Sequence, residues 1–476
     1  MTDRRVVWVI LLAATALRLM IAAQVPIGDD EAYYWAWSQR LAWGYPDHPP
    51  AIAVLIRATT TLLGDSPLAV RAGPVLLTFG IAWLLYDLGR SMFTVEVGTL
   101  AALWFQTIPL FSLGGILSSP DAPFIFFWLL ATWALWRAMD RRGFAWWLIA
   151  GTAVGLAALS KVATLFLGIA FAGYLVWGEK ARRWWRRPEP YVAAVIAVAL
   201  VLPMLRWNAA HGGIMVSKAL NPYVWVETGV PALNALTYAG AHLAYYGPLT
   251  AVLLVASVVA AWRGPRAADR RYVYVVWMTV PIMGFFAAAS LDGIAKPHWT
   301  APGFLVALIP AAALWTTVRD RPWWRRVGTA AIALNLILLG ALGSLALWQG
   351  RPAAAERHAW PEFATQLQQV VNATPGTPGR FILAPDYQTA AQIEYHLRGI
   401  VVTTPFGLDA YKVWVPHAQL IGWNAVVLTA DPPFTGLALG RMFRRVEVLP
   451  SLSVSGRTPQ TFGVRRGLGF QGVVRP

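Results

Sequence analysis

Cysteine is absent from the sequence, and charged residues are scarce. Without cysteine the chain can form no disulfide bond, no thiolate metal site and no cysteine nucleophile. Only 13% of the 476 residues are charged, about half the share of an ordinary soluble domain. The sequence also lacks an internal repeat of roughly 20–50 residues and any low-complexity tract, so a repeat architecture is not expected.

Apolar and aromatic residues are correspondingly abundant in the sequence. Hydrophobic residues make up 57% of the chain, an excess that requires contact with lipid. The 26 tryptophans fit a membrane protein, because an apolar ring with a polar N–H is well placed at the membrane–water interface. The net charge of +16 comes from short basic clusters between apolar runs, so we expect membrane lipid and no nucleic acid as a partner.

Apolar runs long enough to cross a bilayer recur along the first 349 residues. A spanning helix needs about 20 mainly apolar residues, and counting such runs predicts a polytopic α-helical membrane protein with about 11 transmembrane helices. The predicted spans are 6–25, 67–88, 95–116, 121–139, 145–160, 162–178, 190–206, 235–261, 272–289, 299–317 and 327–348.

The basic residues predict how these helices are oriented. Alternate loops carry most of the arginine and lysine, and such loops are normally cytoplasmic. They contain Arg4, Arg5, Arg90, Arg141, Arg142, five basic residues over 180–187, four over 263–271 and four over 319–326. The N-terminus is therefore predicted to be cytoplasmic, and an odd number of spans places the chain after about residue 349 outside the cytoplasm.

Residues 350–476 lack a spanning run and are predicted to form a domain of their own. Alternation of helical and strand patterns indicates a compact α/β unit. The helical patterns lie at 360–371 and 388–397, and the strand patterns at 380–383, 400–403 and 424–429. We thus expect a transmembrane module over 1–349 and a small extracytoplasmic α/β domain over 350–476.

The first loop predicted to lie outside, PIGDDEAYYWAWSQRLAWGYPDHPP at 26–50, concentrates acids and aromatic rings. Its acids Asp29, Asp30 and Glu31 open a predicted amphipathic helix, whose Tyr and Trp side chains suit the interface plane of a membrane. Asp47 and His48 follow this helix. We expect the loop to bring the two acidic clusters together, which is costly unless the acids are protonated, bind a cation or face one.

The acids of this loop also have a purely structural interpretation. Aspartate is a preferred N-cap residue, and we favour this role for Asp29. One cap does not explain the whole cluster, so we favour a functional role for Asp30. Asp47 fits an Asx-turn and a functional role equally well.

Later loops on the same side add further candidates. Asp121 stands at the mouth of a predicted span, where capping the helix and acting in a site are equally plausible roles. His211 could bind a divalent cation beside acids, although a single loop histidine is usually an ordinary surface residue. Lys296 could hold a phosphate or snorkel to lipid headgroups. Lys161 would cost about 2.5–3.5 kcal/mol at a bilayer centre, so we expect it near an interface or facing a polar cavity.

Acids, histidines and cations beside aromatic interfacial segments suit a substrate with an anionic head and an apolar tail. A lipid phosphate would lie against Lys or Arg while its chain occupies a groove between helices. An acid could deprotonate an incoming hydroxyl, and a cation could neutralise the leaving phosphate.

Five segments give the sequence a family resemblance. DEAYYWAWSQRLAWGYPDHPPAIAVLI, SSPDAPFIFFW, GLAALSK, NAAHGG and KPHWTAPGFL occur in this order between about residues 28 and 310. The first resembles the opening periplasmic loop of the GT-C membrane glycosyltransferases. The set is most similar to bacterial relatives of the protein O-mannosyltransferases and the lipid A aminoarabinose transferases. The resemblance implies a polyprenyl-phosphate-linked sugar donor, inversion at the anomeric carbon and a place in the bacterial inner membrane, and it says little about the tail.

The resemblance also implies roles for individual residues. Asp30 matches the acid that opens the family's DE pair, and Asp47 and Asp121 match its further acids. The pair Asp47 and His48 departs from the Glu-Lys of the aminoarabinose transferases, and a neutral histidine neutralises less phosphate charge than a lysine. The resemblance implies that the catalytic residues are Asp30, Asp47 and Asp121. It implies that the substrate-binding residues are Glu31, Tyr34, His48, Lys161, Lys296 and His298. It also implies a divalent metal cation, which not all members require, with the ligands Asp30, Asp47 and His211.

The predicted function is that of an inverting glycosyltransferase. It would move a sugar from a polyprenyl-phosphate-linked donor to a lipid or polysaccharide acceptor on the periplasmic face. A polyprenyl-linked sugar transporter or flippase is the alternative, but transporters place charged sites near the midplane within broken helices, and most acids here lie in loops. A non-catalytic scaffold whose tail binds a partner is a third class. No motif encodes the identity of the sugar or the acceptor.

Overall fold

The computed structural model describes residues 4–141, 143–220, 228–293, 295–348, 353–405, 409–429, 436–455 and 460–473. The contacts between residues divide the chain into two compact units. The helical unit contains Met1–Ala22, His48–Leu55 and Arg71–Leu342. The sheet unit contains Ala23–Asp47, Ile56–Val70 and Gly343–Pro476, so it joins most of the first loop to the tail.

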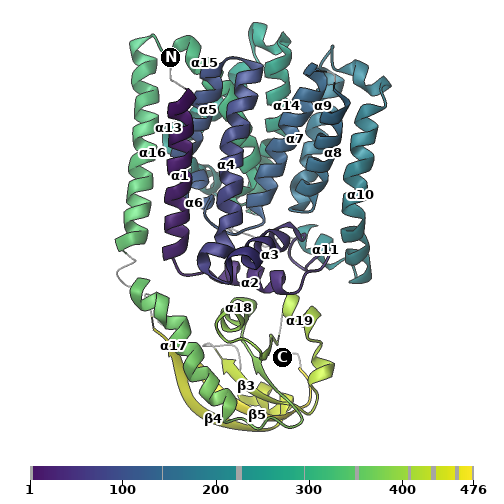
Figure 1. Ribbon diagram of the computed structural model, residues 1–476, viewed down its shortest axis with the longest axis vertical. Coiled ribbons are helices and arrows are strands. Elements are labelled where there is room, and N and C mark those ends of the chain that lie inside the picture. The colour runs from purple at the N-terminus through teal and green to yellow at the C-terminus, as the bar shows by residue number, and fades with distance from the viewer. Residues whose placement is uncertain are drawn as a thin grey trace. The chain divides into compact units, whose positions relative to one another are not determined.

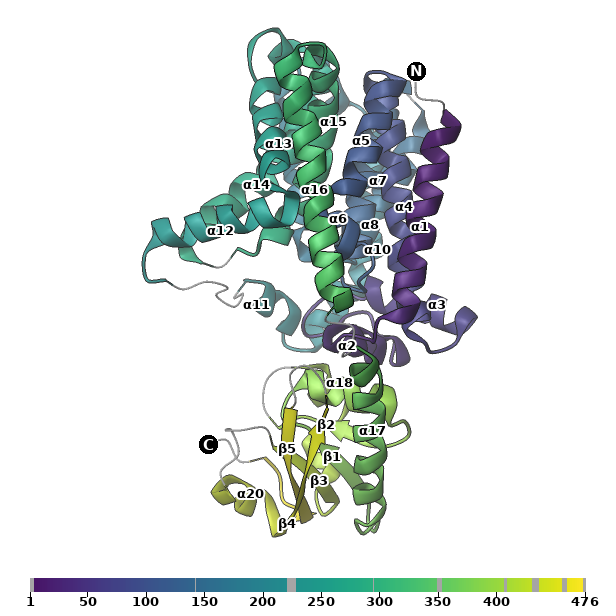
Figure 2. The ribbon, with the colours of Figure 1, turned by 90° about the vertical axis from the view of Figure 1, so that its left-hand side faces the viewer.

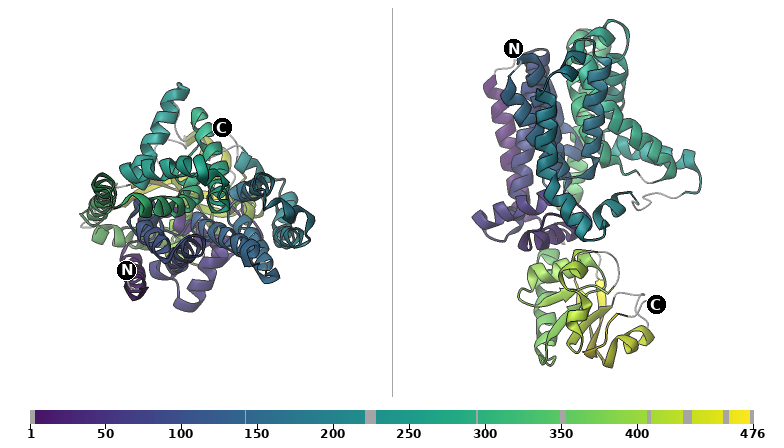
Figure 3. Two further views of the ribbon diagram at one scale, coloured as in Figure 1. Left: turned by 90° about the horizontal axis from the view of Figure 1, so that it is seen from above. Right: turned by 90° about the vertical axis from the view of Figure 1, so that its right-hand side faces the viewer.

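The helical unit is a bundle that contains both long and short helices (Figure 1, Figure 3). Its helices are α1 (Arg4–Gln24), α4 (Pro67–Met92), α5 (Val95–Thr107), α6 (Pro109–Gly114), α7 (Asp121–Arg141), α8 (Phe144–Ala158), α9 (Leu165–Trp177), α10 (Glu189–Ala210), α11 (Ile214–Leu220), α12 (Pro231–Tyr246), α13 (Pro248–Ala261), α14 (Arg270–Ala289), α15 (Ala301–Val318) and α16 (Pro322–Trp348). Its 3-10 turns are η1 (Val162–Thr164), η2 (Arg182–Arg186), η3 (Gly264–Ala268), η4 (Ser290–Asp292) and η5 (Pro297–Thr300). Helix α3 (Ala51–Leu63) begins in this unit and ends in the other.

Within the described residues, seven helices are long and apolar enough to cross a membrane, or eight if α12 and α13 form one span. The seven are α1, α4, α7, α10, α14, α15 and α16 with the turns that extend them, and each overlaps a predicted span. Helix α8 and the stretch of η1 and α9 are apolar but shorter. The polytopic helical architecture is therefore confirmed, whereas the count of 11 spans stays a prediction.

Two of the predicted spans are broken, and their prediction as continuous helices was wrong. The span at 235–261 is divided into α12 and α13, which meet at 106°, and Figure 2 shows α12 running away from the long helices. Gly247 makes this bend with a φ of 85°, which favours glycine, and Pro248 opens the next helix. The span at 95–116 is divided between α5 and α6, because Pro109 disfavours a helical conformation in the residue before it.

The core of the helical unit packs large rings against small residues. Trp128, Trp136 and Trp147 are all fully buried. Where α8 crosses α10, an added Cβ on Gly151 would lie 2.4 Å from the carbonyl oxygen of Ala193, so a larger residue does not fit. Small residues at helix contacts let backbones approach closely, which is how helices associate without a hydrophobic driving force in lipid.

The sheet unit surrounds a mixed sheet. Its helices are α2 (Asp29–Gln39), α17 (Ala353–Asn372), α18 (Tyr387–His396), α19 (Ala410–Trp414) and α20 (Gly436–Met442), with the turn η6 (His417–Leu420). Its strands are β1 (Arg380–Leu383), β2 (Val401–Thr403), β3 (Asn424–Thr429), β4 (Phe443–Val454) and β5 (Gln460–Phe470). The described strands have the order β2-β1-β3-β5-β4. Strand β1 runs parallel to β2 and β3, and β5 runs antiparallel to β3 and β4. The predicted α/β character of the tail agrees with this sheet.

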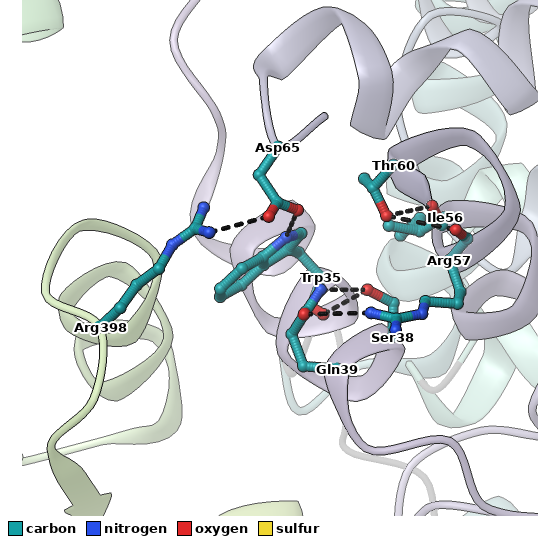
Figure 4. A network of polar contacts seen from close by, with 8 residues as sticks. All are labelled: Trp35, Ser38, Gln39, Ile56, Arg57, Thr60, Asp65 and Arg398. Carbon is teal, nitrogen blue, oxygen red and sulfur yellow. Dashed lines mark hydrogen bonds and ion pairs between the residues drawn. The ribbon is translucent and has the colours of Figure 1, made fainter. Parts of the chain in front are cut away.

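The first loop is part of the sheet unit and not a free interfacial segment. Helix α2 packs on α18 of the tail, and its rings Tyr33, Trp35 and Trp37 are no more than 2% exposed. Asp65 accepts hydrogen bonds from the Trp35 indole and the Arg398 guanidinium, both at 2.8 Å, and so joins three segments (Figure 4). For these three rings, the prediction that they lie in the membrane interface was wrong because they are buried against protein, whereas for the exposed Trp43 it stays a prediction.

Candidate active site

The start of α2 sets the direction of the three acids in the first loop. Gly28 is the N-cap residue, and its backbone N–H donates to the Glu31 carboxylate at 2.9 Å. Asp29, for which we favoured capping, instead accepts from the Gln392 amide at 2.7 Å. That interpretation was wrong because Glu31 occupies the third helical position, from which a side chain reaches back to the cap. A substrate-binding role for the buried Glu31 stays a prediction.

Asp30 and Asp47 flank one pair of tyrosine rings. The Tyr387 hydroxyl and the Gln388 amide donate to the Asp30 carboxylate, at 3.4 and 3.2 Å. The Tyr33 hydroxyl donates to the Asp47 carboxylate at 2.9 Å. The two tyrosine rings are 4.5 Å apart between centroids, so the acids approach the same aromatic pair.

Burial and negative charge keep both tyrosines protonated. The pKa of Tyr387 is raised far above its usual value by burial and then by the charges of Asp30 and Asp47. The pKa of Tyr33 is raised in the same way by burial and by Asp47. Each hydroxyl therefore stays a hydrogen-bond donor to its carboxylate at any physiological pH.

The tail contributes a third acid to this place. The Tyr33 hydroxyl accepts the backbone N–H of Ala410 at 2.9 Å, directly after Asp409. Burial raises the pKa of Asp409, and the charge of Asp47 raises it further. We call Asp30, Tyr33, Asp47, Tyr387 and Asp409 the tyrosine–carboxylate cluster. Tyr34, the neighbour of Tyr33, is half-buried with its ring 5.0 Å from that of Trp37, and its role in substrate binding stays a prediction.

A second cluster lies in the helical unit. The Lys161 ammonium forms an ion pair with the Asp121 carboxylate at 2.7 Å, and the His298 imidazole lies 4.0 Å from the same carboxylate. His48 interacts electrostatically with Asp121, and Lys296 with His298. We call these five residues the Asp121 cluster. The structure thus brings together five residues that the sequence marked in four separate segments.

Lys161 is held at its place by rings as well as by charge. Its ammonium lies 5.9 Å from the centroid of Phe124 and 5.8 Å from that of Trp299. The expected place of this lysine, near an interface or facing a polar cavity, stays a prediction, and the structure pairs it with the Asp121 carboxylate. Asp121 begins α7, and its carboxylate is occupied by the lysine, so it does more than mark a helix end.

Sequence reasoning missed several residues beside these clusters. Tyr387 and Gln388 lie in the tail, and no local pattern connects them to the first loop. His242 lies in α12, where its ring nitrogen is 2.9 Å from the Thr300 hydroxyl. A histidine inside an apolar run is a signal that could have found this contact, because polar residues in membrane helices usually have partners.

The described residues do not assemble a metal site of their own. His211 stacks on Trp207 at 4.0 Å between ring centroids, and its Nδ1 lies 2.8 Å from the Trp207 carbonyl oxygen. Among the described residues, no group of three or more His, Asp or Glu side chains is placed to hold a metal ion. The predicted divalent cation at Asp30, Asp47 and His211 stays a prediction, and no chemical step is derived through it.

The fold and one matched segment relate this chain to known proteins. Residues 47–207 match the family model described as dolichyl-phosphate-mannose-protein mannosyltransferase. The structure of ArnT from Cupriavidus metallidurans bound to undecaprenyl phosphate superimposes with a TM-score of 0.68 at 15% identity, over 95% of this chain and 97% of that one. The chain has the polytopic GT-C fold, and its resemblance to the GT-C membrane glycosyltransferases is confirmed.

One further relative by sequence and one further solved structure are similar to this chain. The lipid A galacturonosyltransferase RgtD of Rhizobium johnstonii is 29% identical over 286 residues, which is 60% of this chain and 60% of that protein. The matched region therefore spans less than two thirds of this relative. The oligosaccharyltransferase of Archaeoglobus fulgidus in complex with Zn and sulfate has a TM-score of 0.55 at 15% identity, over 88% of this chain and 67% of that one, and shares the fold alone.

Proposed function

We propose that this chain is an inverting glycosyltransferase. It moves a sugar from a polyprenyl-phosphate-linked donor to a lipid or polysaccharide acceptor on the periplasmic face of the bacterial inner membrane. The observation that carries this proposal is the pair of carboxylates, Asp30 and Asp47, beside Tyr33 and Tyr387. Two relatives, the lipid A galacturonosyltransferase RgtD and ArnT bound to undecaprenyl phosphate, support a lipid-linked donor and a lipid acceptor.

Asp30 is the general base of the proposed reaction. The acceptor hydroxyl gives its proton to the Asp30 carboxylate while its oxygen attacks the anomeric carbon of the donor sugar. The bond between that carbon and the phosphate oxygen breaks, and its electron pair leaves with the polyprenyl phosphate. One displacement of this kind inverts the anomeric carbon. Tyr387 and Gln388 hold the Asp30 carboxylate in place as neutral donors.

Lys161 and Lys296 are proposed to stabilise the charge on the leaving phosphate. A lysine acts on phosphate as a point charge, and its effect grows in a site from which water is excluded. Asp121 acts as a positioning residue, because its ion pair with Lys161 fixes the ammonium. His48 and His298 are proposed to bind donor oxygens, with less charge than a lysine would bring.

The decisive experiment compares Asp30→Asn with Asp29→Asn in the purified full-length protein. The donors are undecaprenyl-phosphate-linked sugars, including galacturonic acid, and the acceptor is lipid A. We expect Asp30→Asn to lower kcat by about 10²–10⁴-fold, the usual contribution of a general base. Asp29→Asn removes a neighbouring charge whose carboxylate accepts a hydrogen bond from Gln392 of the sheet unit, and this variant should turn over near the wild-type rate. Wild-type turnover by Asp30→Asn would remove this residue from the mechanism.

The identity of sugar and acceptor needs a second measurement. Mass spectrometry of envelope glycolipids and glycans from a strain lacking this chain should show one missing sugar on one acceptor class. An unchanged set of glycolipids and glycans would contradict the proposed activity.

The break between α12 and α13 favours a second candidate function, the transport of a polyprenyl-linked sugar. Transporters build their binding sites near the membrane midplane at interrupted helices. The same purified protein separates the two candidates. Movement of labelled lipid across a vesicle membrane without any glycosylated product would favour transport.

A further inference from the structure

An apolar groove of about 260 Å³ lies in the helical unit between α8, α9 and α10. The floor and walls combine small residues with large rings, and the lining includes Gly151, Gly168, Ala172, Trp147, Phe171 and Trp184. Helix α8 packs against α10, whereas α9 packs against α14. Figure 1 shows α8, α9 and α10 next to one another in the bundle.

This groove is unfilled space. An added Cβ on Gly168 would meet no atom within 4 Å, in contrast to the crowded Gly151 on the neighbouring helix. An apolar cavity of roughly 150 Å³ stays free of water and takes up a benzene-sized guest. A groove of about 260 Å³ with an apolar lining therefore suits part of a hydrocarbon chain.

The end of the groove at η2 is strongly basic. The segment EKARRWWRRPE at 179–189 holds five basic residues and two acidic ones. Trp184 is buried and lines the groove, and the guanidinium groups of Arg183 and Arg187 lie 5.6 and 5.4 Å from its ring centroid. Arg187 forms an ion pair with Glu189 at 2.8 Å. In the part of the chain that the structure describes, neither Arg183 nor Arg186 forms an ion pair.

Aromatic residues at the same end mark the membrane–water interface. Trp185 lines the groove and is 42% exposed, and its carbonyl oxygen accepts the Tyr191 hydroxyl at 2.8 Å. Tryptophan and tyrosine are enriched where headgroups meet hydrocarbon. The η2 end of the groove thus has the basic and aromatic residues that suit headgroup depth, and its lining continues along the apolar helices.

We propose that this groove binds an anionic glycerophospholipid of the surrounding leaflet. One acyl chain occupies the groove, and the phosphate lies against Arg183 and Arg186. The lining residues of α9 run from Leu167 to Leu175, about 12 Å along the axis, which is close to the roughly 15 Å of one leaflet's hydrocarbon. A single diacyl lipid fits this length better than a long polyprenyl chain.

The test uses the full-length protein in nanodiscs of phosphatidylcholine that contain a small fraction of phosphatidylglycerol. Native mass spectrometry counts the lipids that stay bound to the protein after it is released from the nanodisc. The variant Gly168→Leu places a side chain in the groove at a position where an added Cβ meets no neighbour, and Gly340→Leu, at an equally open glycine of α16, is the matched control. We expect Gly168→Leu to abolish retained phosphatidylglycerol and Gly340→Leu to leave it unchanged.

Charge variants test the headgroup contact without altering the groove. Arg183→Gln and Arg186→Gln should each weaken phosphatidylglycerol retention about fivefold, whereas Arg325→Gln in the first turn of α16 should not. Equal retention of phosphatidylglycerol and phosphatidylcholine by the wild type would overturn the proposal. So would equal retention by the two leucine variants, or displacement of phosphatidylglycerol by equimolar undecaprenyl phosphate.

Discussion

The two acidic clusters of this protein satisfy their carboxylates in different ways. In the helical unit, Asp121 is paired with the ammonium of Lys161 at 2.7 Å. In the sheet unit, Asp30 and Asp47 accept hydrogen bonds from the uncharged hydroxyls of Tyr387 and Tyr33. An ion pair cancels charge, whereas a neutral donor orients a carboxylate and leaves its negative charge in place.

This difference agrees with the separate roles that we propose for the two clusters. A base must keep its charge in order to accept a proton, so neutral tyrosine and amide donors suit the role proposed for Asp30. A cation that binds phosphate in a poorly solvated place needs a partner to keep it charged there, and Asp121 is such a partner for Lys161. Each proposed role can be tested by removing one partner.

The largest effect is expected from Lys161→Met, which breaks the ion pair. The two side chains are only 12% and 23% exposed, so we expect a loss that approaches about 3–5 kcal/mol, the cost of breaking a fully buried pair, in which the other charge is left uncompensated. The free energy of unfolding, measured by denaturant titration in detergent, should fall by that amount. The double variant Lys161→Met/Asp121→Asn should recover most of the loss.

A matched control for this prediction is Arg187→Met. It breaks the ion pair to Glu189, in which the arginine side chain is 55% exposed, so water replaces the partner and stability should change little. If both methionine variants lose the same stability, the helical unit does not depend on its buried pair, and the contrast between the clusters disappears.

The next effect is expected from Tyr33→Phe in the sheet unit. This hydroxyl is the bridge between the Asp47 carboxylate and the Ala410 N–H, each at 2.9 Å. Its loss leaves a buried N–H without this partner, at a cost of about 1–3 kcal/mol. Hydrogen exchange of the Ala410 amide should become faster by a corresponding factor. Tyr245→Phe on the exposed face of α12 is the control and should leave that amide unchanged.

The sequence predicts the contacts of one cluster better than those of the other. Asp121, Lys161 and His298 each stand at the end of an apolar run, and ends on one side of a membrane converge because spans have similar lengths. The partner of Asp30 is different, because Tyr387 is 357 residues away and its contact depends on how the tail packs. No local pattern carries that information.

The prediction of strands and helices from the sequence is limited in the same way, because it uses local patterns alone. The short apolar strand β3 at 424–429 was predicted, since it is almost fully buried and its sequence is uniformly apolar after Asn424 up to its last residue. Strand β4 was missed, because Arg444, Arg445 and Glu447 interrupt its alternation on a half-exposed strand. The aromatic residues of α2 pointed to lipid because a ring that packs on protein and one that enters an interface look alike in sequence.

A smaller effect on kcat is expected from Tyr387→Phe, which tests whether this tyrosine only orients Asp30. The hydroxyl donates to Asp30 over 3.4 Å, a long bond, so its removal should lower kcat by no more than about tenfold. The Michaelis constant for the donor should stay near the wild-type value, because in the proposed mechanism Tyr387 orients Asp30 and does not bind substrate. A loss as large as that of Asp30→Asn would instead make Tyr387 a group that touches the substrate.

The smallest expected effect is on the pH dependence of stability, through the half-buried His396 of the sheet unit. Burial lowers the pKa of His396 from 6.5 to about 4. Between these two values the unfolded chain binds a proton that the folded chain does not, so the free energy of unfolding falls as the pH falls from 6.5 toward 4. His396→Gln should flatten this slope. Denaturant titrations of the wild type and the variant at several pH values measure the slopes, and parallel curves for the two proteins would show that burial at this position does not perturb the histidine.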